Sequence, residues 1–311
     1  MEMVKSGNGV AGMSKKLLFI YNPKAGKEHI KEHLAGILDI FAAEDYELRV
    51  VPTRRRDEAR EVVAARGEGY DLVVASGGDG TLDEVVTGMI ESGIRTPIGY
   101  IPAGSTNDYG ESLGLSKNML TAAQTAVKGR MVSCDMGAFN DDIFVYIAAF
   151  GLFTDVSYET DQEVKNVLGH MAYILEGMKR LSSVQSYRLK VTSGDLVIED
   201  EFIFGMITNS RSVGGFKNIT GKNVELDDGE FEVTLIKMPH NPVELNSIMV
   251  SLLNRDIDSE EMYCFKASEI TVESVEPLAW TLDGENGGTH TKAVIRNLHR
   301  AVDIHVDEEE K

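Results

Sequence analysis

Glycines surround an aspartate directly after a short apolar run in the first half of the chain. Residues 72–75 read Leu-Val-Val-Ala, which suits a buried strand, and apolar residues recur at helical spacing from Leu82 onward. The residues between these elements include Gly77, Gly78, Asp79, Gly80 and Thr81. Free N–H groups at such a turn attract phosphate, and glycine lets the backbone come close. A Mg²⁺ ion between Asp79 and a phosphate would turn their repulsion into attraction; the alternative is a tight turn with Asp79 as N-cap.

Two further loops have the same context, because each follows a predicted strand. The first loop consists of Asn22, Pro23, Lys24, Ala25 and Gly26, which add a cation and a second glycine. The third loop, residues 102–109, carries Ser105 and Asn107, whose side chains suit phosphate or ribose oxygens, and Asp108, which could orient a base or a metal-bound water. Thr53, which ends another predicted strand, is a further candidate for binding a nucleotide. Each loop alone is also consistent with an ordinary helix start or a polar turn.

The elements that must position these loops alternate along the first 130 residues. Strands are predicted at residues 16–21, 48–51, 72–75 and 98–101, and helices before residue 41, at 57–66 with Asp57 or Thr53 as cap, from 82, and at 119–127. This alternation predicts a parallel, doubly wound sheet. Ligands of such sheets bind beyond the carboxyl ends of the strands, where all three loops fall.

The pattern changes after about residue 129. Strand-like runs at 143–150, 187–192, 202–208, 231–236 and 269–275 are separated by turn residues, which indicates an antiparallel domain, a sandwich or a partial barrel; we expect the sandwich. Helices are predicted at 164–181, either core or the border of an apolar groove, and at 243–253. We divide the chain into an α/β domain, 14–130, and a β-rich domain, 131–297. Whether residues 298–311 return to the first domain is left open.

Composition narrows the possible partners. The chain has 311 residues, enough for two domains, and no run approaches the roughly 20 apolar residues of a membrane span. A net charge of −19 argues against nucleic acid, which binds basic surfaces, and against tight binding to an anionic membrane. Residues 1–14 are expected to be a disordered leader. Two separated cysteines, Cys134 and Cys264, favour a reduced, cytoplasmic setting.

The three loops, in this order, resemble those of the diacylglycerol kinase catalytic-domain family in its soluble bacterial branch. Residues 76–84 are close to the second family loop, the first has Ala25 where Ser is common, and the third has Ser105 for the usual Thr. NAD kinases share the second loop but not the third. The resemblance extends from about residue 15 to the end of the sequence, and it implies that the loops face the phosphates of ATP.

The resemblance also assigns two acidic turns in the second half. Residues 225–231 look like a structural Mg²⁺ loop, in which Asp228 gives a side-chain oxygen and Glu225 and Glu230 give backbone carbonyls; the alternative is an Asp-Gly hairpin turn. Residues 283–285 resemble the catalytic D-G-E. A hydroxyl that attacks phosphorus must lose its proton, so Asp283 is the predicted base, and Glu285 would orient it or hold the substrate hydroxyl. Asp108 is the next candidate.

We therefore expect an ATP- and Mg²⁺-dependent lipid kinase, with diacylglycerol as the preferred acceptor and the β-rich domain as the lipid site. Its lipid substrate would be met by transient contact with a membrane surface. Two kinds of alternative remain. The acceptor could be another lipid, such as phosphatidylglycerol or a sphingoid base, or it could be a soluble alcohol or NAD. The chain could instead be a non-catalytic regulator that binds a nucleotide or a lipid. A homodimer is left open.

Overall fold

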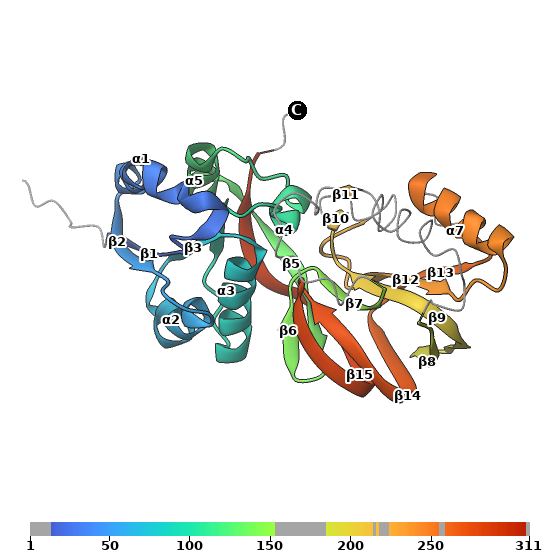
Figure 1. Cartoon of the computed structure of the whole chain (residues 1–311). Coiled ribbons are helices and arrows are strands. Elements are labelled where there is room, and N and C mark those ends of the chain that lie inside the picture. The colour runs from blue at the N-terminus through green and yellow to red at the C-terminus, as the bar shows by residue number, and fades with distance from the viewer. Residues whose placement is uncertain (1–13, 153–184, 214–215, 218–223, 255–258, 309–311) are drawn as a thin grey trace, which may run out of the picture.

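The computed structural model of the chain describes residues 14–152, 185–213, 216–217, 224–254 and 259–308 (Figure 1). The expected leader and the predicted helix at 164–181 lie outside these residues. One long mixed sheet dominates the described part, with the strand order β13-β12-β9-β7-β14-β15-β4-β3-β1-β2. Helices lie above and below its parallel end and its antiparallel end extends to the other side of the molecule, so the fold is mixed α/β (Figure 1).

The parallel end contains the four predicted strands. They are β1 (Lys15–Tyr21), β2 (Tyr46–Pro52), β3 (Leu72–Gly77) and β4 (Ile98–Pro102). The longer helices here are α1 (Ile30–Ala43), α2 (Glu58–Arg66), α3 (Asp79–Ser92) and α5 (Met119–Lys128), with short helices at Ala25–Glu28, Gly67–Gly69 and α4 (Asp108–Ser112).

Helices pack on both faces of this parallel part. Leu17 and Phe19 of β1 belong to one apolar cluster with α1 and α5, whereas Leu18 and Ile20 belong to another with α2 and α3. Successive side chains of a strand point to opposite faces, so each face of the sheet is covered. The near-continuous apolar runs that predicted these strands are explained by this burial on both sides.

The antiparallel part contains most of the remaining strands. They are β5 (Arg130–Phe139), β6 (Asp142–Phe144), β7 (Ile147–Gly151), β8 (Tyr187–Ser193), β9 (Leu196–Thr208), β12 (Phe231–Lys237), β13 (Met262–Ala267) and β14 (Glu269–Leu282). Helix α7 (Pro242–Asn254) agrees with the predicted helix, and β10 (Ser212–Val213) and β11 (Phe216–Lys217) form a small separate sheet.

Four of these strands close a ring. The early residues of the long strands β9 and β14 pair with β8, and their later residues pair with β7. The described strands therefore correspond to the partial barrel rather than to the two separate sheets of the expected sandwich. Long strands that change partner along their length cause this difference, because they carry one hydrogen-bond ladder around the core.

Strand β15 (Glu285–Val306) connects the two parts of the sheet. It pairs antiparallel with β14 and β5, and near its end Ile304 pairs parallel with Ile98 of β4. Residues 298–306 of the segment that the sequence left open thus reach the parallel strands. Because β15 begins at Glu285, it also starts directly at one of the acidic turns.

Three local features differ from the predictions. The run at 143–150 is interrupted between β6 and β7, and β5 was not predicted because Ser133, Asp135 and Gly137 interrupt its apolar residues. At the start of α2, neither Asp57 nor Thr53 provides a side-chain cap. Glu84 of α3 instead accepts hydrogen bonds from the N–H groups of Asp57 and Ala59 at 2.9 and 3.0 Å.

In the described part of the chain, none of the helices is long and apolar enough to cross a membrane.

Candidate active site

The three loops begin side by side because the strands before them are neighbours. The N–H of Asn22 after β1 donates to the carbonyl of Ser76 in β3 at 2.8 Å, and the N–H of Ala103 after β4 donates to Gly77 at 2.7 Å. The carboxyl ends of parallel strands meet at one edge of a sheet, as the sequence predicted for these loops. The first and third loops are thus fixed on either side of the glycine turn.

Glycines allow the loops to touch one another. A Cβ added to Gly26, whose φ is +52°, would lie 2.0 Å from the carbonyl oxygen of Ala103. A Cβ added to Gly104 would lie 2.6 Å from the Cα of Gly78. Any side chain at these two positions would force the loops apart. The result is a cradle of closely packed main chain, which suits an oxygen-rich anion such as phosphate.

Asp79 holds this cradle together. It is the first residue of α3, so Gly78 stands at the N-cap. Its carboxylate accepts the N–H groups of Asp108 at 3.1 Å and Tyr109 at 3.2 Å, which join the glycine turn to the third loop. Burial, followed by the nearby Asp108 charge, raises the pKa of Asp79 to about 6.

Asp108, whose N–H bonds to Asp79, has a buried side chain. Its Oδ1 accepts a hydrogen bond from the hydroxyl of Ser212 at 2.8 Å. Within the same loop, Asn107 closes a local ring: its Oδ1 accepts the Gly104 N–H and its Nδ2 donates to the Gly104 carbonyl, each at 2.8 Å. Two polar residues that the sequence assigned to chemistry or ligand contact therefore shape the loop itself.

A pocket of ≈ 500 Å³ opens over the cradle. Seven of the predicted binding residues line it, namely Asn22, Lys24, Ala25, Thr53, Gly78, Gly80 and Thr81. Six others, namely Pro23, Gly26, Gly77, Asp79, Ser105 and Asn107, are not among its lining residues. Of the three predicted catalytic residues, Glu285 lines the pocket, whereas Asp283 and Asp108 do not.

Five lining residues were not predicted as binding residues. They are Arg54, Arg55, Arg56, Glu84 and Gly104. Three consecutive arginines directly after a predicted strand, in a chain of net charge −19, were a signal that could have identified the first three. The place of Glu84 had no such signal, because it depends on how α3 packs against α2.

Asp283 occupies a strained turn and is buried. Its φ is +51°, a left-handed conformation that costs about 1 kcal/mol or more for a residue other than glycine. The carboxylate accepts three main-chain N–H groups: Val145 at 2.5 Å, and Tyr146 and Ile147 at 3.0 Å each. Burial raises its pKa to about 7, although these hydrogen bonds oppose the rise. Asp283 thus fixes the break between β6 and β7.

Glu285, two residues later, extends into the pocket. Its carboxylate forms an ion pair with Arg56, which comes from the loop between β2 and α2. A Cβ added to Gly80 would lie 3.3 Å from Glu285 Oε1, so the carboxylate lies close to the glycine turn. The pocket therefore has backbone loops from the parallel part on one side and a carboxylate from β15 on the other.

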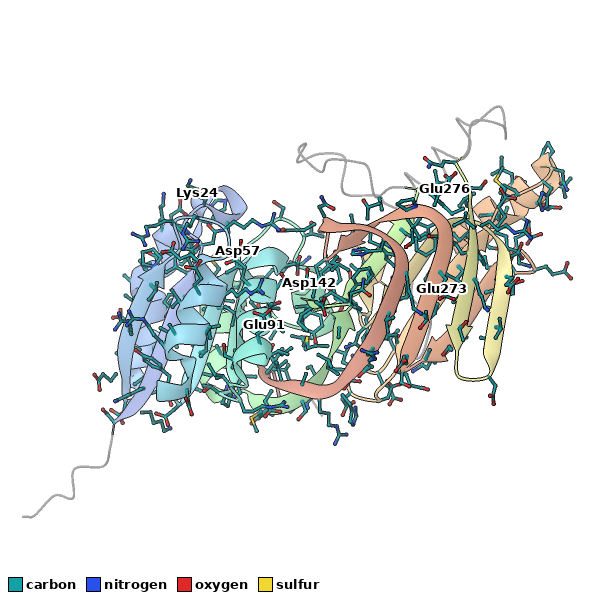
Figure 2. The ribbon with its side chains drawn as sticks, turned by 90° about the horizontal axis from the view of Figure 1, so that it is seen from below. Lys24, Asp57, Glu91, Asp142, Glu273 and Glu276 are labelled. Carbon is teal, nitrogen blue, oxygen red and sulfur yellow. The ribbon has the colours of Figure 1, made fainter. Side chains whose placement is uncertain are left out.

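More carboxylates gather beside this pocket. Asp57 of the α2 start and Asp142 of β6 line a smaller cavity of ≈ 80 Å³ together with Asp83 and Glu285 (Figure 2). Burial, and then the charge of Asp283, raise the pKa of Asp83 well above its ordinary value. By contrast, Glu273 and Glu276 lie far out on the antiparallel part (Figure 2).

The predicted metal turn lies in a different place. Asp228 Oδ2 pairs with Lys266 Nζ at 2.6 Å, its Oδ1 accepts the Glu230 N–H at 3.0 Å, and the Glu225 side chain is exposed. No group of three His, Cys, Asp or Glu side chains that could hold a metal was found among the described residues. In this arrangement the Asp228 carboxylate is paired with a lysine ammonium, and the carbonyl ligands predicted for Glu225 and Glu230 are not tested by side-chain positions. The assignment of this turn stays a prediction.

A buried aspartate supports the same turn. Asp135 Oδ2 accepts the Gly229 N–H at 2.6 Å, and its Oδ1 accepts the Arg300 N–H at 2.7 Å. The ring nitrogen Nδ1 of His299 lies 3.0 Å from the same Oδ1. The turn is therefore fixed by protein groups of β5 and β15.

Known proteins match this chain over most of its length. The sequence profile of the diacylglycerol kinase catalytic domain matches residues 16–139. A diacylglycerol kinase of Bacillus subtilis (strain 168) is 32% identical over 293 residues, which are 93% of this chain and 96% of that protein. A diacylglycerol kinase of Staphylococcus aureus (strain bovine RF122 / ET3-1) is 32% identical over 294 residues, 94% of this chain and 92% of that protein.

Solved structures are also similar to this chain in fold. One from Bacillus anthracis str. Sterne has a TM-score of 0.81 at 26% identity and covers 95% of this chain and 98% of its own. Another, of a diacylglycerol kinase from the same organism, has a TM-score of 0.75 at 24% identity with the same coverage, which supports the fold. The phosphate cradle, the carboxylate facing it and these relatives lead to one conclusion. The chain belongs to the diacylglycerol kinase family and is an ATP-dependent kinase with that family's catalytic domain.

Proposed function

We propose that this chain transfers the γ-phosphoryl group of ATP to the hydroxyl of diacylglycerol. The observation that carries this proposal is the pocket in which three phosphate-type loops face the Glu285 carboxylate. The other lining carboxylate, Glu84, already accepts two N–H groups at the start of α2. The names of the two relatives at 32% identity support diacylglycerol as the acceptor. The doubly wound arrangement of the nucleotide-binding domain, 14–130, and the lipid role of residues 131–297 are parts of the same proposal.

The cradle suits the phosphates of ATP. Gly78, Gly80 and Gly104 line the pocket without side chains that would fill it, and Lys24 adds a cation at its edge. Main-chain N–H groups fixed in this way need no rearrangement when charge moves during the reaction. We treat Mg²⁺ as part of the Mg·ATP substrate, since it screens the phosphate charge from the surrounding carboxylates.

We assign the proton acceptor to Glu285 rather than to Asp283, the base predicted from the sequence. Asp283 already accepts three N–H groups with its two oxygens and does not line the pocket. A general base must lie within hydrogen-bond reach of the proton it accepts, and Glu285 meets this condition once a substrate hydroxyl enters. In this assignment Asp283 holds the turn from which Glu285 projects.

The reaction then balances as a direct in-line transfer. The hydroxyl oxygen of the lipid forms a bond to the γ-phosphorus, and the bond from that phosphorus to the β,γ-bridging oxygen breaks. The hydroxyl proton passes to the Glu285 carboxylate, and ADP leaves with the electron pair of the broken bond. The loops hold the phosphates in line and the turn holds the acceptor, so that most of the catalysis comes from positioning and charge.

The lipid is met at a membrane surface by transient contact in this proposal, with the chain itself on the cytoplasmic side. The net charge of −19 works against lasting attachment to anionic lipids, which favours short encounters. Self-association as a homodimer is a separate proposal that a sedimentation measurement would test.

The deciding experiment is a kinase assay over a panel of acceptors. Purified protein, Mg·ATP and detergent micelles with diacylglycerol, phosphatidylglycerol or a sphingoid base are compared with NAD in detergent-free buffer. We expect phosphatidic acid as the main product and no product with Glu285→Gln at matched protein concentration. If another acceptor is turned over faster, that acceptor replaces diacylglycerol as the proposed substrate. If ATP binds without any turnover, the result supports the non-catalytic regulator instead.

A further inference from the structure

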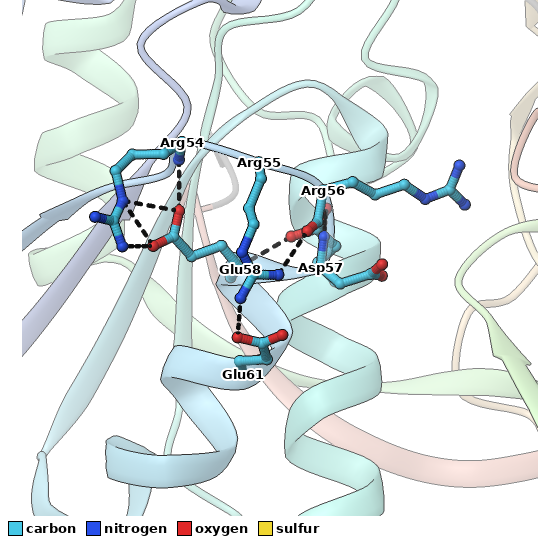
Figure 3. A network of polar contacts seen from close by, with 8 residues as sticks. Arg54, Arg55, Arg56, Asp57, Glu58 and Glu61 are labelled. Atoms are coloured by element: carbon cyan, nitrogen blue, oxygen red, sulfur yellow. Dashed lines mark hydrogen bonds and ion pairs between the residues drawn. The ribbon is translucent and has the colours of Figure 1, made fainter.

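Three consecutive arginines at the mouth of the pocket have different partners. Arg54 pairs with Glu58 and Arg55 pairs with Glu61, both on helix α2 just after the loop. Figure 3 shows these two side chains turned toward the helix, whereas Arg56 extends away from it. Arg56 pairs instead with Glu285 on β15, in the other part of the molecule.

The Arg56–Glu285 pair lies across the pocket and is open to solvent. The two side chains are 69% and 45% exposed, and both residues line the same pocket as Gly78, Gly80 and Gly104. Exposed ion pairs contribute little stability, because water screens both charges. A guanidinium bound to phosphate is held more strongly, since its planar fork can donate two hydrogen bonds to one phosphate group.

We propose that Arg56 binds the phosphate groups of the nucleotide and changes partner when it does so. In the nucleotide-free chain its guanidinium pairs with Glu285; with nucleotide bound it pairs with phosphate, which leaves the Glu285 carboxylate without its cation. This inference rests on the proposed function, because it assumes that the pocket takes ATP and that Glu285 accepts the proton. It explains why only one of the three arginines is not paired with α2.

The exchange links nucleotide binding to the acceptor carboxylate. While Arg56 is paired with it, the Glu285 carboxylate already holds a guanidinium, which occupies the position that a substrate hydroxyl would need. When phosphate takes the guanidinium, the carboxylate becomes available in the pocket where the hydroxyl must react. Glu285 would thus be freed only in molecules that already hold the nucleotide.

The experiment measures binding of a non-hydrolysable ATP analogue with Mg²⁺ by calorimetry, so that it needs no turnover. We expect Arg56→Gln to weaken binding about 10- to 100-fold, the range for a lost hydrogen bond to a charged group, and Arg56→Lys to weaken it less. The matched control is Arg66→Gln, which removes an exposed arginine of α2 that lines neither this pocket nor the smaller cavity beside it. It should bind as the wild type does.

The second variant tests the exchange itself. Glu285→Gln frees Arg56 in advance, so binding should tighten about 1.5- to 5-fold, the worth of an exposed ion pair. In the Arg56→Gln background the same change should have a clearly smaller effect. Equal tightening in both backgrounds would mean simple repulsion by Glu285, and would overturn the exchange.

The outcomes separate this inference from the proposed function. If the wild type fails to bind the analogue, the proposed function itself is wrong. If the wild type binds and Arg56→Gln binds as well as Arg66→Gln does, the function stands and the role of Arg56 is wrong.

Discussion

The glycine turn at residues 77–81 and the acidic turn at residues 283–285 use the same structural device but present different groups to the pocket. Each contains an aspartate that accepts main-chain N–H groups from a distant segment: the half-buried Asp79 from the third loop and the buried Asp283 from the break between β6 and β7. The glycine turn then presents bare backbone, whereas the acidic turn presents the side chain of Glu285.

This difference shows that an aspartate in a motif need not be the group that reacts. Both aspartates have raised pKa values, to about 6 for Asp79 and about 7 for Asp283, mainly because they are buried. A buried carboxylate with several N–H donors is well suited to fixing a loop. The residues that face the pocket are their neighbours, and the comparison predicts distinct effects for each kind of position.

The largest effect should come from Glu285→Gln. Glutamine keeps the size of the side chain but cannot accept a proton, so kcat should fall about 10²- to 10⁴-fold. Single-turnover kinetics with saturating diacylglycerol in mixed micelles would measure the chemical step. A rate within about threefold of wild type would mean that another residue is the general base. The proposed difference between the two turns would then be wrong.

The second-largest loss of activity should come from Asp79→Ala, which removes the hydrogen bonds between the glycine turn and the third loop. The N–H groups of Asp108 and Tyr109 would lose their acceptor, at a cost of about 1–3 kcal/mol in the free energy of unfolding for each donor left unpaired. Turnover should fall at least about tenfold, because loop misplacement weakens in-line positioning. Urea unfolding and steady-state kinetics test this together. Asp79→Asn, which retains one acceptor oxygen, should recover part of both losses.

Much of the parallel part could be predicted from the sequence because its signals are local. The apolar run of β3 and the glycines after it determine a strand and a turn within a few residues, and β1 and β4 behave in the same way. The break at Val145 could not be predicted, since its cause is a hydrogen bond to Asp283, 138 residues away in the sequence. The same distance hid the structural role of Asp283, and the partner of Arg56 depends on how β15 lies across the pocket.

Asp283→Asn should reduce stability more than it reduces chemistry. An asparagine amide cannot accept the Val145 N–H where the carboxylate oxygen did, so one buried donor is left unpaired at about 1–3 kcal/mol. The loss of kcat should be smaller than for Glu285→Gln. Thermal unfolding and single-turnover kinetics on the two variants in parallel would check this order, and a larger kinetic loss for Asp283→Asn would restore Asp283 as the base.

The smallest effect concerns Asp83 and depends on pH. Its pKa is raised in the folded chain above the ordinary 3.8, so its contribution to stability is complete below that pH and is lost as the pH rises toward the folded value. Asp83→Asn removes the ionisable group and keeps an oxygen for the Thr87 hydroxyl. The variant should therefore gain stability relative to wild type between pH 5 and pH 7 in urea unfolding. If the variant and the wild type differ by the same free energy of unfolding at pH 5 and at pH 7, the raised pKa of Asp83 is contradicted.

Strand β15 also has a consequence for the order in which the molecule is made. The loops of the phosphate cradle leave the ribosome early. Ile98 of β4 pairs with Ile304, which is synthesised about 200 residues later, so this edge of β4 stays unpaired until then. Pairing between segments so far apart is slow, because a large loop must be closed before any contact is gained. The nascent chain thus carries an open strand edge through most of its synthesis, which is the kind of surface that chaperones protect and that aggregation uses.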